Sequence, residues 1–314
     1  MTTAQPEART TLIRRLSFSR ALPDRPLDRW MCLVALGIIG GMAGANVIWT
    51  LQTWPMGDIQ IYWDAGQRIL SGEPLYPGSS PFTSFRYAPW FAWAWAGFSV
   101  LPYWLVAVAW QGALLAACVA IAMPFVRSGV LGVAFAGLMV PLLFAVSAGG
   151  NVQALIVVSL LYGVDRRSGP LWIAIAASLR ATPILFVAVY AARREWKRFW
   201  ITLALTAILV APMLLYNPET LLTDVAGREP GLLYFSPILY LAVAAASVGV
   251  VAVLAYRRSP YTIIAAAAAA VVASPKLFAY DVTTLAAVNP HSPNHSDENL
   301  RAAAPTRSPA PGSE

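Results

Sequence analysis

Asp58 is the first residue of this chain whose type and position could do chemistry. It follows Pro55 and Gly57 at the start of 58–70, where apolar residues fall on one helical stripe. This pattern predicts a short helix lying on a membrane surface with a carboxylate at its mouth. Such a carboxylate could act as a general base toward an attacking hydroxyl. It could also simply cap the helix, because Asp is a favoured N-cap residue.

Asp64 does not form a catalytic pair with Asp58 on this helix. Six residues separate the two, which places their side chains about 240° apart around a helix. The spacing therefore argues against the two-carboxylate arrangement of a glycosidase.

Arg180 is the second candidate, near the middle of an apolar segment over 171–192 and three residues before Pro183. An arginine inside a membrane is costly and indicates a partner or a ligand. Pro183 is expected to bend the helix. Two interpretations stay open: an ion pair with a carboxylate from another span, or a guanidinium that faces a water-filled cavity and grips a phosphate.

Three further polar residues interrupt apolar segments. Lys276 and Asp281 stand five residues apart and could be an interfacial anchor pair or part of a binding site. Gln153, with Asn151, follows a Gly-Gly break, where their side chains are expected to satisfy backbone groups inside the membrane.

The composition is that of a membrane protein. Hydrophobic residues make up 58% of the chain and charged residues 12%. Several apolar runs approach the roughly 20 residues that a spanning helix needs, and they predict an all-α, polytopic transmembrane bundle of about nine spans. The net charge of +7 does not indicate nucleic acid, because many Lys and Arg residues flank the spans. Cys32 and Cys118 lie in apolar runs, so no cysteine-based metal site is expected.

Three regions divide the chain. Residues 1–29 carry six arginines and are expected to form a cytoplasmic basic arm, residues 30–288 the transmembrane domain, and residues 289–314 a disordered polar tail. Because the arm holds the start of a first span over 31–50 in the cytoplasm, the loop over 54–86 is expected outside.

The remaining spans are expected from the apolar runs. The second is short and rich in tryptophan, and Arg166-Arg167 falls on the non-cytoplasmic side of the scheme, against the rule that basic loops face the cytoplasm. An apolar run that resumes at Asp281 stops at Val288, as if a final span were cut short. The expected spans are 87–101, 103–126, two short spans within 130–164 that meet at a break over 147–151, 171–192, 199–216, 237–256, and a run from Tyr261 to Ser274.

Taken in order, these motifs resemble glycosyltransferase family 87, the polyprenol-phosphate-mannose-dependent mannosyltransferases with a GT-C-type membrane fold. The resemblance covers about 30–288 and is most specific over 58–89. The motifs that carry it are Asp58-Ile-Gln-Ile-Tyr62, Ser71-Gly72-Glu73-Pro74-Leu75-Tyr76-Pro77, Tyr87-Ala88-Pro89, Gly150-Asn151-Val152-Gln153, Arg180-Ala181-Thr182-Pro183, Ser274-Pro275 and Tyr280-Asp281. The family usually has Lys where Arg180 stands.

The resemblance implies roles for particular residues. Asp58 matches the family's acidic residue in the first extracytoplasmic loop, the expected catalytic base. The expected donor-phosphate or substrate-binding residues are Arg180, Lys276, Arg86, Tyr62, Tyr87, Gln153 and Asp281.

The function expected from the resemblance is transfer of mannose from a polyprenyl-phosphate donor to a glycolipid or lipoglycan hydroxyl, with inversion. It would take place on the outer face of the plasma membrane. No cofactor is expected, and the sequence shows no clear metal-binding cluster, which favours a metal-independent reaction. Two alternatives stay open: a transporter or flippase of lipid-linked substrates, and a non-catalytic membrane partner.

Overall fold

The computed structural model describes residues 57–76, 85–216, 232–275 and 278–288, together with separate helical positions between Trp30 and Ile48. Throughout these residues the chain forms helices and turns and contains no strand, which confirms the all-α class. The basic arm, most of the first predicted span, the polar tail and Lys276 lie outside the described residues.

Three of the described helices are long and apolar enough to cross a membrane: α5 (Tyr103–Arg127), α6 (Val130–Ala148) and α13 (Pro237–Tyr256). Each matches a span expected from the sequence, and together they support a membrane protein.

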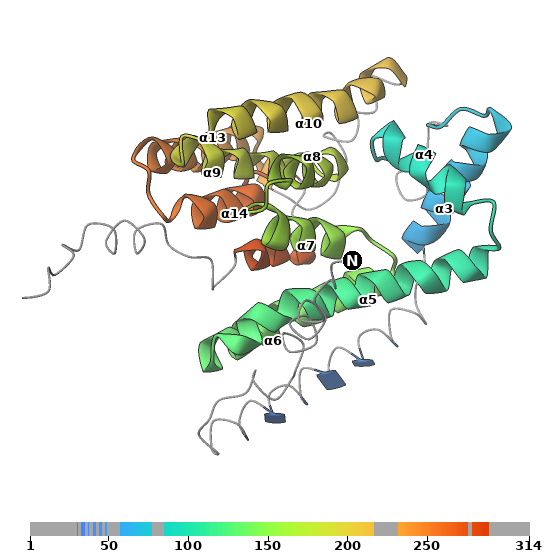
Figure 1. The fold of residues 1–314 in the computed structure, drawn as a ribbon, viewed down its shortest axis with the longest axis horizontal. Helices are drawn as coiled ribbons and strands as arrows, with labels where there is room; N and C mark the ends of the chain where they lie inside the picture. Colours follow the sequence, from blue (N-terminus) through green and yellow to red (C-terminus); the bar gives the residue numbers. More distant parts are fainter. Residues whose placement is uncertain are drawn as a thin grey trace, which may run out of the picture.

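The other helices pack around these three. Figure 1 shows α3 and α4 together over one end of α5, while α7 lies between the α5–α6 pair and the group formed by α8, α10, α13 and α14. A closing 3-10 helix, η3, contacts α6, α7 and α14. The bounds are α3 (Gly57–Ser71), α4 (Pro89–Phe98), α7 (Gln153–Gly163), α8 (Gly169–Leu179), η2 (Thr182–Phe186), α9 (Val187–Ala192), α10 (Trp196–Tyr216), α12 (Leu232–Phe235), α14 (Thr262–Val272) and η3 (Ala279–Ala287).

The helix predicted over 58–70 is present as α3, and its apolar stripe is used against protein. Ile59, Tyr62 and Ala65 are fully buried, and the helix packs against α4. Leu70, which the stripe included, is exposed. Packing inside the protein therefore accounts for much of the pattern that suggested a surface helix.

An aromatic cluster joins α3, α4 and α5. The Tyr62 ring lies 5.1 Å from that of Phe91 and 5.4 Å from that of Trp95, and Trp95 lies 4.9 Å from Trp110 in an edge-on arrangement. Pairs of this kind add about 0.5–1.5 kcal/mol each beyond the burial of their surface. The cluster fixes α3, and hence Asp58, to the first long helix.

The span expected over 87–101 is corrected by the structure. Its helix, α4, has only ten residues, which gives a length of about 15 Å. The hydrocarbon core of a bilayer is about 30 Å thick, so α4 by itself is too short to cross it. The same holds for α7 and α14, which have eleven residues each and correspond to two further expected spans. The run is apolar because Phe91 and Trp95 belong to the aromatic cluster, and the chain turns at Ser99, whose hydroxyl donates to carbonyl oxygens of Trp95 and Trp63.

The span expected over 171–192 is also corrected. Helix α8 ends at Arg180, whose backbone is extended, and the chain returns through η2 and α9. The return is closed at its base, where Tyr190 donates to the Val164 carbonyl at 2.9 Å and Arg193 pairs with Asp165 at 2.7 Å. The segment is thus a helical hairpin with Arg180 at its tip, instead of one bent helix.

The break expected over 147–151 is confirmed between α6 and α7. Gly150 has a φ of +88°, in the left-handed region that side chains disfavour. A Cβ there would lie 2.2 Å from Ile59 Cγ1, so the break presses directly on the start of α3.

Gly150→Ala is expected to destabilise the protein by about 2–4 kcal/mol, because it adds a left-handed backbone penalty to a steric clash with Ile59. The measurement is thermal unfolding in detergent. Gly149→Ala is the matched control, since Gly149 has a helical φ and its Cβ would find only the Val146 carbonyl at 3.5 Å. Equal melting temperatures for the two variants would contradict this account of the break.

Candidate functional site

Asp58 lies in the first turn of α3, half-buried, facing the break between α6 and α7. Its backbone N–H donates to the Gly149 carbonyl at 3.0 Å, and its Oδ2 accepts from Asn151 Nδ2 at 2.8 Å. The carboxylate of this half-buried residue is therefore held in a fixed orientation by a second element.

Asn151 makes more contacts than its place in the break predicts. Besides contacting Asp58, its Oδ1 accepts from the backbone N–H of Gln153, the first residue of α7, at 3.0 Å. It satisfies the broken backbone as expected and also orients the carboxylate. Its place directly after two glycines was the available signal.

Gln153 is buried and links three segments. Its Nε2 lies 3.3 Å and 3.2 Å from the Thr283 and Thr284 hydroxyls of η3, and its Oε1 accepts from Arg180 Nη1 at 3.3 Å. With 1% of its surface exposed, Gln153 positions Arg180 instead of presenting its own amide to solvent.

Arg180 forms the ion pair that stood as one of its two interpretations. Its Nη1 lies 2.5 Å from Asp281 Oδ1, and the Asp281 side chain is only 3% exposed, whereas that of Arg180 is 23% exposed. The guanidinium also lies 5.5 Å from the centroid of the Tyr280 ring. Asp281 is held further by the N–H of Phe278, which donates to Oδ2 at 3.0 Å.

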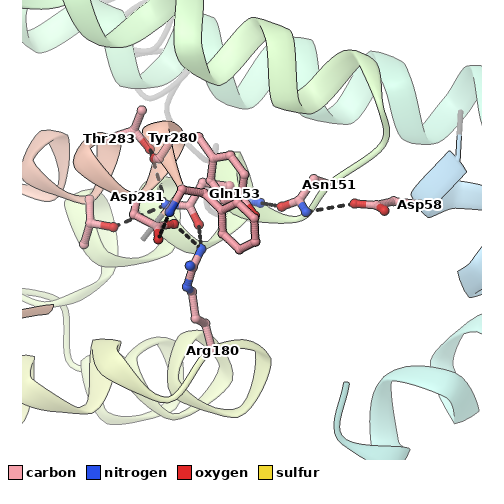
Figure 2. Close-up of polar contacts among 9 residues, drawn as sticks. Asp58, Asn151, Gln153, Arg180, Tyr280, Asp281 and Thr283 are labelled. Atoms are coloured by element: carbon pink, nitrogen blue, oxygen red, sulfur yellow. Dashed lines mark hydrogen bonds and ion pairs between the residues drawn. The ribbon is translucent and has the colours of Figure 1, made fainter. Parts of the chain in front are cut away.

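Figure 2 shows how these contacts form one connected polar network inside an apolar bundle. Asp58 and Asn151 lie at one end of it, and Arg180 and Asp281 at the other, with Gln153 between them. The sequence predicted four of these five residues as site residues but did not predict which contacts they make.

Tyr62 and Tyr87 meet beside Asp58. The Tyr62 hydroxyl donates to that of Tyr87 at 3.0 Å, and the Tyr76 hydroxyl holds the Tyr87 carbonyl at 2.8 Å. Burial raises the pKa of both Tyr62 and Tyr87, so both hydroxyls stay protonated. Tyr62 is fully buried, so in this structure it does not present a surface to a substrate. Its contact with the Tyr87 hydroxyl gives it a supporting position instead of the binding position expected from the sequence.

The last two predicted binding residues have different outcomes. Arg86 is half-buried directly before Tyr87, and Lys276 lies outside the described residues. Over the described ranges, no three His, Cys, Asp or Glu side chains gather as they would around a metal ion.

Burial raises the pKa of Asp58 above its ordinary value, and the hydrogen bond from Asn151 partly opposes that shift by stabilising the charged form. A carboxylate whose pKa is raised toward neutrality is a stronger base than an exposed one, which suits proton abstraction.

No protein-family model matches the chain, and it has no match among curated proteins or solved structures. Over the described residues, the fold and the site indicate an all-helical membrane protein with a polar network that joins half-buried Asp58 to the ion pair between Arg180 and buried Asp281.

Arg180→Gln is expected to cost about 3–5 kcal/mol of stability, because it leaves Asp281 buried without its cation. Adding Asp281→Asn should restore most of the loss, which thermal unfolding in detergent would detect as a rise in melting temperature.

The matched control is Arg193→Gln, which breaks the more exposed pair with Asp165 and is expected to cost at most about 1 kcal/mol. If Arg180→Gln were no more destabilising than Arg193→Gln, the ion pair with Asp281 would not contribute to the free energy of unfolding as expected here.

Proposed function

We propose that this protein is an integral-membrane mannosyltransferase. It transfers mannose from a polyprenyl-phosphate donor to a hydroxyl of a glycolipid or lipoglycan, with inversion at the anomeric carbon. The observation that carries the proposal is the carboxylate of half-buried Asp58, which Asn151 orients through a hydrogen bond at 2.8 Å and whose pKa is raised by burial. The identity of the sugar and the donor rests on the resemblance of the motifs to family 87.

Asp58 accepts the proton of the acceptor hydroxyl as that oxygen attacks the anomeric carbon. The bond from that carbon to the phosphate oxygen breaks, and polyprenyl phosphate departs with the electron pair. Attack from the face opposite the leaving group inverts the configuration. Since phosphate leaves readily, no side chain has to protonate it.

The departing phosphate is stabilised by cations, and Arg180 is the described one that belongs to the network with Asp58. A guanidinium carries five N–H donors in a planar fork, so one edge stays on Asp281 while another meets a phosphate oxygen. Arg86, beside Tyr87, and Lys276 are the other proposed cations.

The positions of the basic residues support an extracytoplasmic site. Helix α7 begins at the break beside Asp58 and ends before Arg166, and the α8–α9 hairpin carries Arg180 at its tip and Arg193 at its base. Near the end of α7, the Tyr162 hydroxyl donates to the Ala120 carbonyl at 2.7 Å, so this end of α7 lies beside the last turns of α5, which ends at Arg127. Arg127, Arg166 and Arg193, at the ends of these segments, thus lie at one end, and Asp58 lies toward the other. Because basic loops favour the cytoplasmic side, Asp58 would face outside.

The decisive experiment supplies purified protein in detergent with radiolabelled polyprenyl-phosphate-mannose and a membrane glycolipid. Label appearing on the glycolipid supports the proposal. In vesicles, movement of labelled donor between leaflets without transfer would instead identify a flippase. If neither transfer nor movement is observed, the remaining interpretation is a non-catalytic membrane partner.

Asp58→Asn is expected to reduce transfer at least a thousandfold, because the amide cannot accept the hydroxyl proton, while its oxygen still accepts from Asn151 and preserves the fold. The assay is initial-rate label transfer, with thermal unfolding as the test of folding. Near-normal turnover by a stably folded Asp58→Asn protein would remove the general-base role.

Asn151→Ala is expected to move the acidic limb of the kcat/KM profile to higher pH. The base must be ionised, so activity falls as pH falls through its pKa, and losing the amide donor raises that pKa further. The full pH profile of transfer distinguishes this from mere misplacement of Asp58, which would lower activity without moving the limb.

A further inference from the structure

Helix α4 has an outer face that no part of the described chain covers. Four residues on one face of this helix are exposed: Trp93, Ala94, Gly97 and Phe98. The exposed fraction is 59% for Trp93 and 48% for Phe98. The opposite face carries Phe91 and Trp95 into the aromatic cluster. An exposed apolar helix face of this kind needs a partner.

The exposed apolar surface continues past the end of α4. Val100 is 70% exposed, Leu101 43% and Trp104, in the first turn of α5, 67%. No charged residue occurs from Tyr87 to Val126, the stretch that contains both helices. Since α5 is one of the three helices fit to cross a membrane, the α4 face adjoins the point where that helix enters the bilayer.

Charge marks a different side of this unit. Helix α3, which packs against α4, carries Asp64 and Arg68 with part of their surface accessible, and Glu73 just beyond its end is exposed. Gln67 donates to the Ser99 carbonyl, so polar groups cover the backbone of the α4–α5 corner from the α3 side. The unit therefore has a charged helix and an uncharged helix joined by an aromatic core.

We propose that α4 and the first turn of α5 are embedded in the lipid leaflet nearest Asp58, with Trp93 and Phe98 at the boundary between headgroups and acyl chains. A helix too short to cross, without charge and with tryptophan on its free face, fits that depth. Lipid is the proposed contact of this face because the exposed apolar surface continues into α5, a helix fit to cross the membrane. A soluble partner could not cover a surface that continues into the bilayer. The proposal does not depend on any enzymatic activity.

The test measures the depth of spin labels in the full-length protein reconstituted into phosphatidylethanolamine–phosphatidylglycerol vesicles. Single cysteines are placed as Ala94→Cys and Phe98→Cys in protein whose Cys32 and Cys118 are replaced by alanine. Glu73→Cys is the matched control on the charged side. Collisions of each label with oxygen, which concentrates in lipid, and with a water-soluble nickel chelate are compared.

Embedding predicts that the ratio of oxygen to nickel collisions at positions 94 and 98 exceeds that at position 73 by about tenfold. Nickel accessibility equal to that at position 73 would overturn the proposal in favour of a water-exposed face. Low accessibility to both reagents would also overturn it, and spin–spin broadening would then identify a second copy as the cover. Ala94→Cys changes an exposed small residue, so folding is retained even if Phe98→Cys disturbs packing.

Discussion

The contact between the start of α3 and the break after α6 is the constraint on which the rest of the site depends. Irregular backbone inside an apolar bundle leaves N–H and C=O groups that must find partners within the protein. Here the Gly149 carbonyl accepts from the N–H of Asp58, and Asn151 bonds both the Asp58 carboxylate and the first N–H of α7. Satisfying the break and orienting the carboxylate are therefore one arrangement, and Gly150 permits it by leaving room for Ile59.

A second constraint follows from placing charge in an apolar interior. Asp281 is almost completely buried, so its ionised form requires the Arg180 guanidinium and the Phe278 N–H. Gln153 then couples this pair to η3 and, through its own backbone, to Asn151. A structural ion pair and a phosphate site are compatible here. The pair with Asp281 fixes the rotamer of the partly exposed arginine, so the side chain loses less conformational entropy when it binds a phosphate.

Local patterns predicted much of this fold, and the failures share a cause. The bounds of α3, α5 and α13 follow from helical periodicity and from long apolar runs between polar residues. Hydrophobicity does not distinguish a helix that contacts lipid from one that packs on aromatic rings, so α4 was expected to cross. Likewise, Pro183 indicates a distortion but not its size, and Arg180 at an extended backbone position ended the helix altogether. The contacts of Asn151 and Gln153 join residues distant in sequence, which spacing alone cannot predict.

The two corrected segments have one combined consequence for the direction of the chain. If 87–101 crosses the membrane, Arg127 and Arg166 both fall on the non-cytoplasmic side, away from Arg193 and from the arginines of residues 1–29. A non-crossing α4 reverses the direction of α5, α6 and α7, which moves Arg127 and Arg166 together to the cytoplasmic end. Because α8 and α9 form a hairpin that returns to the end where it began, Arg193 stays on the cytoplasmic side, where the expected spans also place it. Its pair with Asp165 requires that same end. Removing both crossings thus satisfies the preference of basic loops for one side without moving any later segment, and it leaves Asp58 and Arg180 away from the basic end.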